Sequence, residues 1–567
     1  MRWVKKEQPD ETSVQNLANA LQVSPRIANL LLLRGIKDYD AAKAFFRPDI
    51  SMLHNPFLMQ DMDVAVKRLN QAIATNEQIL IYGDYDVDGT TAVSLVYSYL
   101  SGFYDNVHYY IPDRYDEGYG ISMKSIDFAS DNDFSLIIAL DCGIKAIDQV
   151  DYASKKNIDY IICDHHRPGE KLPAAVAVLD QKRVDCNYPY KELSGCGIGF
   201  KFMQAFHQQK GGDVLDLYPL LDLVATSIGA DIVPITGENR VLAALGLQVI
   251  NTNPRIGIRA LMELVKKKKF TITDVVFIIA PRINAAGRIK HGKFAVELLI
   301  EHDFDTALQF AQEIEINNAD RKGLDKQITA EALQQIEELG EQERASTVVY
   351  QEDWHKGVIG IVASRLIETY YRPTVVFTKN NEKLAASVRS VSGFDVYEAL
   401  HACKEHILQF GGHKYAAGLT LSPDKYTDFK EAFEIVVDNT LPEALRTREQ
   451  KIDTTLVLSD ITPKFWRIIK QFAPFGPGNM KPVFVAYNLQ DTGFGKTVGA
   501  DDLHLKLKIT DTTIAYSIDA IGFNLGKKLA LTKNKKTFDA LFQLDENTWN
   551  DKTTIQLKLI DIKSSII

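Results

Sequence analysis

Apolar and polar residues follow one another along the first half of the chain in the pattern of a parallel sheet covered by helices. Short apolar runs alternate with stretches of helical periodicity, such as residues 90–100. Strands that are apolar on both faces are buried between two layers of helices, which is the usual environment of a parallel sheet. The expected strands are residues 78–82, 107–111, 136–140, 158–163 and 176–179.

The rest of the pattern divides the chain into regions. Residues 303–340 have the composition of one long helix, with Gly323 placed to interrupt it. From about residue 450, alternation with a period of two is typical of the short strands of a small barrel. We predict an α/β protein with a helical N-terminal extension (1–55), a parallel-sheet domain (56–250), a helical connector (251–343), a smaller α/β domain (344–445) and a C-terminal OB-like barrel (446–567).

The composition is that of a globular chain and excludes several other classes. Hydrophobic residues make up 46% and charged residues 25% of the chain, and no apolar run approaches the ~18–20 residues that span a bilayer. The first residues are polar and contain no signal-peptide core. The five cysteines form no Cys-x-x-Cys pair, which disfavours a disulfide framework or a thiolate zinc site. We expect a cytoplasmic protein that is not bound to a membrane.

The net charge of −9 argues against a protein that coats nucleic acid, but the charge is unevenly distributed. Residues 264–293 contain eight basic residues and one acid, Asp274, while residues 526–536 contain five lysines and no acid. These stretches are candidates for local contact with a nucleic-acid strand, although a lysine run is more often a solvated surface. The barrel adds three candidates for base stacking, namely Tyr516, Phe523 and Trp549.

The densest acidic motif, GDYDVDG at residues 83–89, follows the first expected strand. Its carboxylates, Asp84, Asp86 and Asp88, stand at alternate positions of a strand-to-helix loop and repel one another. A divalent cation offsets that repulsion most directly, and a solvated acidic turn is the alternative. A calcium loop of the EF-hand type is disfavoured because the twelfth position counted from Asp84 holds no glutamate.

A second cluster, Asp164, His165 and His166, follows another expected strand. One histidine is more often structural, but two adjacent histidines at the carboxyl end of a parallel strand favour a ligand role. Imidazole combined with carboxylate suits Mn²⁺, Zn²⁺ or Fe²⁺. Asp141 ends the intervening strand and Asp231 follows a helix, and each of these two, taken alone, is more typical of a cap or a turn.

Taken together, the motifs resemble those of the DHH phosphoesterase superfamily: GDYDVDGTT (83–91), DCGI (141–144), DHH (164–166) and ADIVP (230–234). Further motifs resemble those of one family, the RecJ single-strand-specific DNA exonucleases: PRINAAGR (281–288), WHKGVIGIVASRL (354–366), SVRS (387–390), GGHKYAAG (411–418) and FGPGN (475–479). The resemblance extends over nearly the whole chain. It implies a DHH domain, a DHHA1 domain and an OB-like domain that binds nucleic acid.

The resemblance implies a site with two divalent ions, Mn²⁺ or Mg²⁺, that activate water for attack on phosphorus. It implies that Asp86 binds one ion, that Asp88 binds the other and that Asp141 bridges both. His165 and Asp231 would complete the coordination of the second ion. The implied metal ligands are Asp84, Asp86, Asp88, Asp141, His165 and Asp231. The implied catalytic residues are His166, which would lie against the scissile phosphate, Asp164, which would orient the histidines, and Asp141.

By the same resemblance, the substrate contacts come from the later motifs. Arg389 offers a fork of donors suited to phosphate, and the pair Gly411 and Gly412 lets the backbone approach an anion, although a glycine pair alone is more typical of a plain loop. The expected substrate-binding residues are Asn284, Arg288, His355, Arg389, Gly411, Gly412 and His413. The expected partners are single-stranded DNA and, from the family context, a helicase and a single-strand-binding protein, and we expect a monomer.

The leading hypothesis is a metal-dependent 5′-to-3′ exonuclease that degrades single-stranded DNA to mononucleotides in repair and recombination. Its direction comes from the resemblance alone. One alternative is a phosphodiesterase for short oligonucleotides or cyclic dinucleotides, which has no evident need of a long connector and a barrel. Another is a non-catalytic replication scaffold, which the full set of acids and histidines disfavours.

Overall fold

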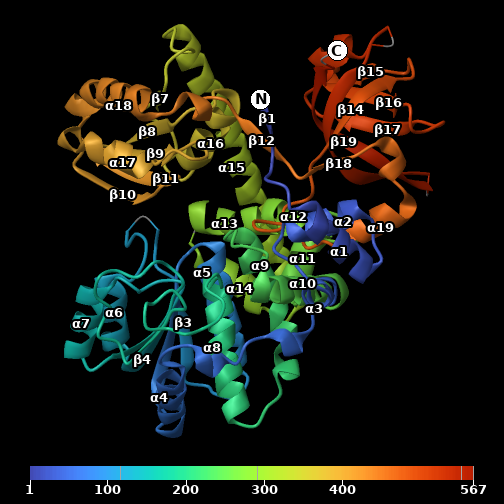
Figure 1. The fold of residues 1–567 in the computed structure, drawn as a ribbon. Coiled ribbons are helices and arrows are strands. Elements are labelled where there is room, and N and C mark those ends of the chain that lie inside the picture. Colours follow the sequence, from blue (N-terminus) through green and yellow to red (C-terminus); the bar gives the residue numbers. More distant parts are fainter. Residues whose placement is uncertain (115, 290, 535, 551, 566–567) are drawn as a thin grey trace.

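Two α/β lobes and a β-barrel surround a helical centre in the computed structural model, which describes residues 1–114, 116–289, 291–534, 536–550 and 552–565 (Figure 1). The lobes lie one above the other on the same side of the molecule, and the barrel lies on the opposite side. The predicted α/β fold with a C-terminal barrel is confirmed. Among the described helices, none combines the length and the apolar character that a bilayer crossing requires.

Five parallel strands form the sheet of the first lobe, in the spatial order β3–β2–β4–β5–β6. Their bounds are Gln78–Gly83 (β2), Val107–Tyr110 (β3), Phe134–Leu140 (β4), Asp159–Cys163 (β5) and Ala177–Leu179 (β6). The register aligns Gly83 with Leu140 and Leu140 with Cys163. The residues that follow these three strands therefore leave the sheet at one edge, which is where parallel sheets bind their ligands.

Helices cover both faces of this sheet. On the face presented by Ile79 and Ile81 lie α4 (Met62–Ala74), α5 (Val87–Ser101) and α8 (Gly195–Gln209). On the face presented by Leu80 and Tyr82 lie α6 (Met123–Asp131) and α7 (Ile147–Lys155). The α5 and α8 side continues into the helical centre, which comprises α9 (Leu221–Ala230), α10 (Gly237–Thr252), α11 (Ile256–Glu263), α12 (Ile272–Asp274), α13 (Ala280–Ile289) and α14 (Lys293–Ile300).

One long helix, α15 (Phe304–Glu338), connects the helical centre to the second lobe. Its first half buries Ala311 and Ile314 in the core of the first lobe, and its second half buries Ile328 and Ala332 against the second lobe. The predicted interruption at Gly323 is wrong, because the helix runs through this residue unbroken. Packing at both ends outweighs the weak helix propensity of one exposed glycine.

The second lobe contains a five-stranded sheet in the order β10–β11–β9–β8–β7, in which only β7 and β8 are parallel. The strands are Thr347–Tyr350 (β7), Thr374–Asn380 (β8), Lys383–Arg389 (β9), Gln409–His413 (β10) and Ala416–Leu421 (β11). The helices are α16 (Ile359–Thr369), α17 (Val396–Ala402) and α18 (Tyr426–Thr440). Gly411 and Gly412 thus belong to a hairpin strand rather than to a loop, and their contact with an anion stays a prediction.

The barrel is a seven-stranded sheet in the order β13–β14–β18–β19–β17–β16–β15, and it closes by pairing β14 with β16. The strands are Thr454–Thr455 (β13), Phe484–Asp491 (β14), Lys496–Val498 (β15), His504–Thr510 (β16), Ile518–Gly522 (β17), Phe538–Trp549 (β18) and Lys552–Ser564 (β19), and helix α19 (Pro463–Lys470) lies between β13 and β14 in the sequence. The stretch IAYSIDAIGF (514–523), whose residues suit a strand, is a strand only over β17. Residues 511–517 instead form the turn that β16 and β17 need to run antiparallel.

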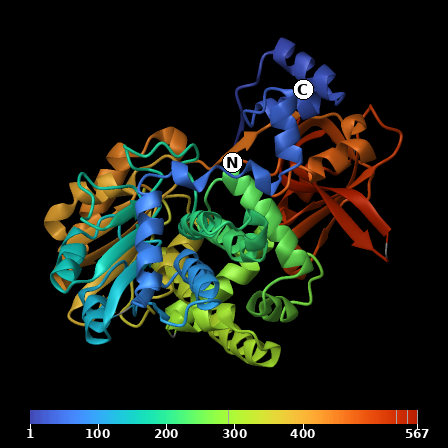
Figure 2. The ribbon, with the colours of Figure 1, turned by 90° about the horizontal axis from the view of Figure 1, so that it is seen from below.

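The N-terminal extension packs on the barrel rather than on the lobe that follows it in sequence (Figure 2). Its helices are α1 (Glu11–Leu21), α2 (Pro25–Leu32) and α3 (Tyr39–Phe46), and Leu17 and Leu30 share one apolar core with Phe484 of the barrel. A first strand, β1 (Arg2–Lys5), pairs in parallel with β12 (Glu449–Ile452). The sequence did not predict this strand, because four mixed residues carry no periodicity.

Replacing Gly323 with alanine should stabilise the protein. An added methyl group would meet no heavy atom within 4 Å, and alanine in an exposed helix is favoured over glycine by about 0.5–1 kcal/mol. We expect a higher unfolding midpoint in chemical denaturation for Gly323→Ala. Gly257 in α11 is the matched control, because its added carbon would lie 2.1 Å from the Leu298 carbonyl oxygen. Gly257→Ala should lower the midpoint, and a lower midpoint for Gly323→Ala would contradict the prediction.

Candidate metal centre

Three buried acids follow the three aligned strands of the first lobe. Asp84 comes directly after β2, Asp141 after β4 and Asp164 after β5, and all three carboxylates are buried. Asp141 has a φ of 60°, which is uncommon for a residue other than glycine and turns the chain sharply at the end of its strand. The edge of the sheet therefore gathers negative charge that water does not screen.

The other two acids of the GDYDVDG motif begin helix α5. Asp86 is the N-cap, and its carboxylate accepts a hydrogen bond of 3.0 Å from the backbone N–H of Gly89. Asp88 lies in the first turn, where the positive end of the helix dipole favours a carboxylate. Gly89 allows the loop to fold back, because a Cβ there would lie 2.4 Å from the carbonyl oxygen of Asp84.

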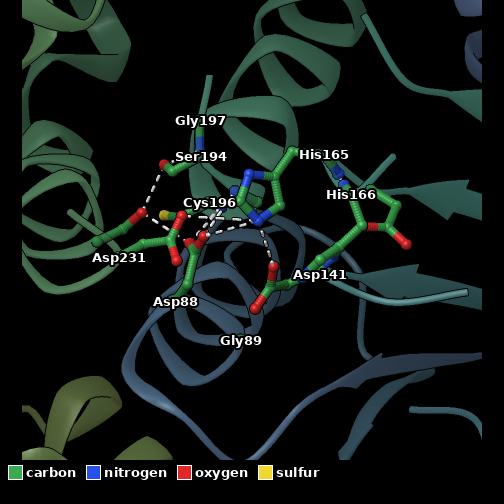
Figure 3. A network of polar contacts seen from close by, with 12 residues as sticks. Asp88, Gly89, Asp141, His165, His166, Ser194, Cys196, Gly197 and Asp231 are labelled. Atoms are coloured by element: carbon green, nitrogen blue, oxygen red, sulfur yellow. Dashed lines mark hydrogen bonds and ion pairs between the residues drawn. The ribbon is translucent and has the colours of Figure 1, made fainter. Parts of the chain in front are cut away.

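The start of helix α8 holds the carboxylate of Asp88 in place (Figure 3). Asp88 accepts hydrogen bonds from the backbone N–H of Gly195 at 2.7 Å and of Cys196 at 2.8 Å. A third bond of 2.6 Å comes from the hydroxyl of Ser227 in α9. Sequence reasoning missed these residues, although the glycine-rich segment LSGCGIG (193–199) is the kind of helix start that brings N–H groups to an anion.

Close packing at the same helix start requires glycine. A Cβ on Gly195 would lie 2.6 Å from Oδ1 of Asp141, so any side chain there would displace the carboxylate. Ser194 caps the helix by accepting a hydrogen bond of 3.2 Å from the N–H of Gly197. The carboxylates of Asp88 and Asp141 are thus brought together by one helix end.

His165 lies at the centre of the cluster, and the contacts drawn in Figure 3 converge on its Nε2 atom. That nitrogen is 3.1 Å from Oδ1 of Asp141, 3.6 Å from Oδ2 of Asp231 and 3.7 Å from Oδ2 of Asp88. Burial lowers the pKa of His165, which favours the neutral imidazole that binds metal ions. Among the described residues, two sets of side chains have ligand atoms within 4.8 Å of one another: Asp141 with His165 and His166, and Asp88 with His165 and Asp231.

Asp164 faces the histidines rather than the other acids. Its Oδ1 accepts a hydrogen bond of 2.7 Å from Nδ1 of His166, and its Oδ2 accepts one of 2.9 Å from the N–H of Ile144. Burial acts to raise the pKa of Asp164, but the hydrogen bond and charge of His166 outweigh it and lower the pKa to about 2. The same bond outweighs burial at His166 and raises its pKa. The pair therefore favours a protonated His166 with its Nε2 turned outward, where the hydroxyl of Tyr119 lies at 3.2 Å.

The remaining acids are poorly satisfied without a cation. Burial, followed by the charges of neighbouring acids, raises the pKa values of Asp84 and Asp141 well above their ordinary range and that of Asp231 to about 8. Both oxygens of Asp84, Oδ1 of Asp141 and Nδ1 of His165 are buried and have no hydrogen-bond partner among the described residues. Because buried polar atoms without partners cost free energy, carboxylates and imidazole arranged in this way fit a bound divalent ion.

Not every predicted ligand enters the two sets around His165. Asp84 and Asp86 follow the same strand end, and the charge of Asp86 acts on Asp84, but neither belongs to either set. The division of the acids between two ions stays a prediction.

The predicted substrate contacts lie on two parts of the molecule. Asn284 is half-buried in α13, the helix that approaches the acidic loop where a Cβ on Gly287 would lie 2.8 Å from the Tyr85 carbonyl oxygen. The side chain of Arg288 lies outside the described residues. In the second lobe, burial and then the charge of Arg114 from the first lobe lower the pKa of His355, so this residue faces the first lobe.

Arg389 and the glycine pair stand at different places on the second sheet. Arg389 in β9 is half-buried, and its Nη1 donates to the Val388 carbonyl at 2.8 Å and to the Ser387 hydroxyl at 3.3 Å. Gly411, Gly412 and His413 are exposed in β10. Gly412 has a φ of 144°, and a Cβ there would lie 2.5 Å from the Ala416 carbonyl oxygen, so glycine is required for this hairpin.

Comparison with known proteins finds family models that match three regions of the chain. Family models match residues 78–228 (DHH family, N-terminal domain), 344–439 (DHHA1 domain) and 452–561 (RecJ OB domain). The single-stranded-DNA-specific exonuclease RecJ of Bacillus subtilis (strain 168) is 35% identical over 99% of this chain and 70% of its own length. The protein of the same name from Haemophilus influenzae is 32% identical over 96% of this chain and 97% of its own length.

Solved structures show the same similarity in three dimensions. The crystal structure of RecJ in complex with Mn²⁺ from Thermus thermophilus has a TM-score of 0.86 and 26% sequence identity, and the match covers 100% of this chain and 80% of that one. The corresponding structure with Mg²⁺ has a TM-score of 0.79 and 25% identity, and the match covers 100% and 79% of the two chains.

Replacing Asp141 with asparagine should stabilise the metal-free protein and weaken its response to Mn²⁺. The change removes one charge from a buried group of like charges, and asparagine tolerates the φ of 60°. We expect the thermal midpoint without metal to rise by about 2 °C or more, as a change of ~1 kcal/mol would produce in a domain of this size. The further rise that Mn²⁺ gives to the unmodified protein should be largely lost.

Asp133→Asn is the matched control for this experiment. Asp133 belongs to the same lobe and has a φ of 58°, but its side chain is exposed. The control should change neither midpoint. An Asp141→Asn protein that is less stable without metal, or that gains as much from Mn²⁺ as the unmodified protein, would show that the acids do not repel one another in the way described.

Proposed function

Because the chain belongs to the RecJ family of single-stranded-DNA-specific exonucleases, we propose that it hydrolyses single-stranded DNA from the 5′ end and releases mononucleotides. Its role would be in DNA repair and recombination. The observation that carries the proposal is the cluster in which the buried His165 Nε2 lies within 3.7 Å of three carboxylates, Asp88 and Asp141 buried and Asp231 at the opening. The direction of degradation rests on the family resemblance alone.

The cluster fits two divalent ions, and Mn²⁺ or Mg²⁺ is proposed because relatives have been crystallised with these metals. When bound, such a pair lowers the pKa of the attacking water and neutralises the charge that develops on the phosphate. The residues that would hold the ions are Asp84, Asp86, Asp88, Asp141, His165 and Asp231. Asp88 is fixed for this task by three donors from α8 and α9, so its carboxylate needs no rearrangement when a cation arrives.

His166 would act on the substrate itself. Its ring is 34% exposed, compared with 8% for His165, so it faces the opening of the site. Asp164 holds Nδ1 of His166 and favours its protonated form, which leaves Nε2 as a donor for a phosphate oxygen. The ring thereby supplies a positive charge beside the scissile phosphate without depending on a residue from outside the first lobe.

The second lobe would hold the incoming strand. Burial lowers the pKa of Arg389, and the structure gives this guanidinium no carboxylate partner among the described residues, so a phosphate is a suitable counter-charge. His355 faces Arg114 of the first lobe. Single-strand selectivity follows if the strand passes between the two lobes, because a duplex is far wider than one strand.

The setting of the enzyme is inferred from its chemistry. All five cysteines are buried and free, which suits a reducing compartment, and we place the protein in the cytoplasm. The residues proposed for the site come from one chain, so a monomer is sufficient for the reaction. Because the substrate must be single-stranded, a helicase is a natural supplier, and a single-strand-binding protein is a natural companion on the same strand.

End-labelled DNA tests the proposed activity. In the presence of Mn²⁺, single-stranded DNA labelled at the 5′ end should release labelled mononucleotide at once, while the 3′ label should be released last. Duplex DNA and a cyclic dinucleotide should remain intact. Asp88→Asn should reduce the rate about 10³-fold, because several kcal/mol of charge stabilisation depend on the ions it would hold. Cleavage of the dinucleotide, with the single strand left intact, would favour the alternative phosphodiesterase. Early release of the 3′ label would show that degradation starts at the 3′ end.

The role of Arg389 can be tested through substrate affinity. Arg389→Lys keeps the charge but loses the two-pronged donor geometry, so KM for single-stranded DNA should rise about tenfold while Mn²⁺ binding stays unchanged. Lys383→Ala is the control, because Lys383 is exposed on the same strand β9. Equal KM values for Arg389→Lys and the unmodified enzyme would show that Arg389 does not bind the substrate strand in this way.

A further inference from the structure

The loop that carries Asp231 has an unusual backbone. Asp231 ends α9, and the next residue, Ile232, has a φ of 59° although 63% of it is exposed. A β-branched side chain in the left-handed region is costly, and such a conformation persists only where the surrounding structure over-determines it. Something beyond the local sequence must therefore hold residues 232–236.

The restraint comes from the barrel side of the molecule. The backbone N–H of Ile235 donates a hydrogen bond of 2.7 Å to the carbonyl of Pro477, which belongs to the FGPGN motif between α19 and β14. On the other side of the loop, the Pro234 carbonyl accepts bonds from the Tyr190 hydroxyl at 3.2 Å and from Nδ2 of Asn239 at 3.1 Å. The loop is thus held between its own lobe and a distant part of the chain.

Two glycines of the motif fit closely against this loop. A Cβ on Gly476 would lie 2.5 Å from Cγ1 of Ile235, and a Cβ on Gly478 would lie 2.7 Å from Cγ2 of Thr236. Gly478 also has a φ of 73°. Any larger residue at either position would have to push the Asp231 loop away, so the glycines are needed for the contact as well as for the turn.

Hydrogen bonds fix the segment that leads into the motif, residues 471–474, and tie the end of the motif to it. The guanidinium of Arg240 in α10 donates to the carbonyls of Phe45 (3.0 Å), Gln471 (3.4 Å), Phe472 (2.9 Å), Ala473 (3.1 Å) and Pro474 (3.4 Å). Asn479 adds bonds of 2.8 Å from its Nδ2 to the carbonyls of Phe472 and Pro474, and its Oδ1 accepts from Nε of Arg34 at 2.8 Å. A loop bonded in this way is a rigid surface rather than a flexible link.

We propose that residues 475–479, here called the latch, are a positioning element that holds Asp231 where it can share a divalent ion with Asp88 and His165. The inference rests on the proposed function, because it assumes that this cluster binds the ion. The latch contacts no member of the cluster among the described residues, and it acts through the backbone from Ile235 back to Asp231. The barrel then supports the metal site in addition to any part it has in holding DNA.

A pair of compensating substitutions tests the latch. Gly478→Ala should press on the Cγ2 methyl of Thr236, displace the loop and weaken Mn²⁺ binding about tenfold, as the loss of an outer support to a metal ligand commonly does. Adding Thr236→Ser removes that methyl and keeps the hydroxyl that lies 3.1 Å from the Tyr190 hydroxyl. The next heavy atom would be 3.6 Å away, which is an ordinary contact, so the double variant should recover an affinity within about twofold of the unmodified protein.

Gly493→Ala is the matched control. Gly493 belongs to the same barrel and has a φ of 96°, but a Cβ there would meet no atom within 4 Å. Both glycine variants carry the same kind of backbone strain, but only Gly478→Ala should lose Mn²⁺ affinity. Affinity is measured on the whole protein by titration with Mn²⁺, following the free ion by electron paramagnetic resonance, and Thr236→Ser alone is measured alongside.

The outcomes separate the two proposals. If Gly478→Ala binds Mn²⁺ as tightly as Gly493→Ala, or if Thr236→Ser fails to restore its affinity, the latch does not position Asp231. If the unmodified protein binds no Mn²⁺, the proposed function is wrong, and the inference about the latch is wrong as well. Weakened binding in Gly478→Ala with recovery in the double variant supports the latch.

Discussion

Buried carboxylates repel one another at the edge of the first sheet, and the fold has to hold them together against that repulsion. The register of β2, β4 and β5 brings Asp84, Asp141 and Asp164 to one edge, and the start of α5 adds more acids to it. The protein offsets this charge in different ways: Asp164 is neutralised by His166, and Asp88 is satisfied by N–H groups at a helix end. Both oxygens of Asp84 and Oδ1 of Asp141 remain without hydrogen-bond partners among the described residues, and this uncompensated charge marks where a cation belongs.

The parts of the site that depend on local sequence patterns could be predicted from the sequence. Apolar runs predicted the strands, and acids at their ends predicted a cluster, because parallel strands end at the same edge. It missed the donors to Asp88, since Gly195 and Ser227 meet that carboxylate only after α8 and α9 have packed. The pairing of β1 with β12 was not predicted, because it joins segments that are far apart in the sequence. The predicted interruption of α15 at Gly323 is wrong, because packing along the helix outweighs the weak helix propensity of one glycine.

The net charge of −9 proves a poor guide to nucleic-acid binding in this molecule. Part of the local basic charge is already paired with acids of the same chain, since Lys267 pairs with Asp274 at 2.5 Å and Lys528 pairs with Asp561. The neighbouring lysines at 266, 268 and 269 are exposed and accessible to other partners. The acids are concentrated at a sheet edge and the free cations lie elsewhere, so averages over the whole chain conceal both.

The parallel pairing of β1 with β12 also has a consequence for biosynthesis. Arg2 bonds to Glu449, 447 residues further along, and the apolar faces of α1 and α2 are covered by the barrel that follows. At a synthesis rate of about 5–20 residues per second, the N-terminal helices wait roughly half a minute or longer on the ribosome before their partner strands exist. During that time Leu17 and Leu30 lack the barrel residues that complete their core, so these helices are made long before they reach their final packing.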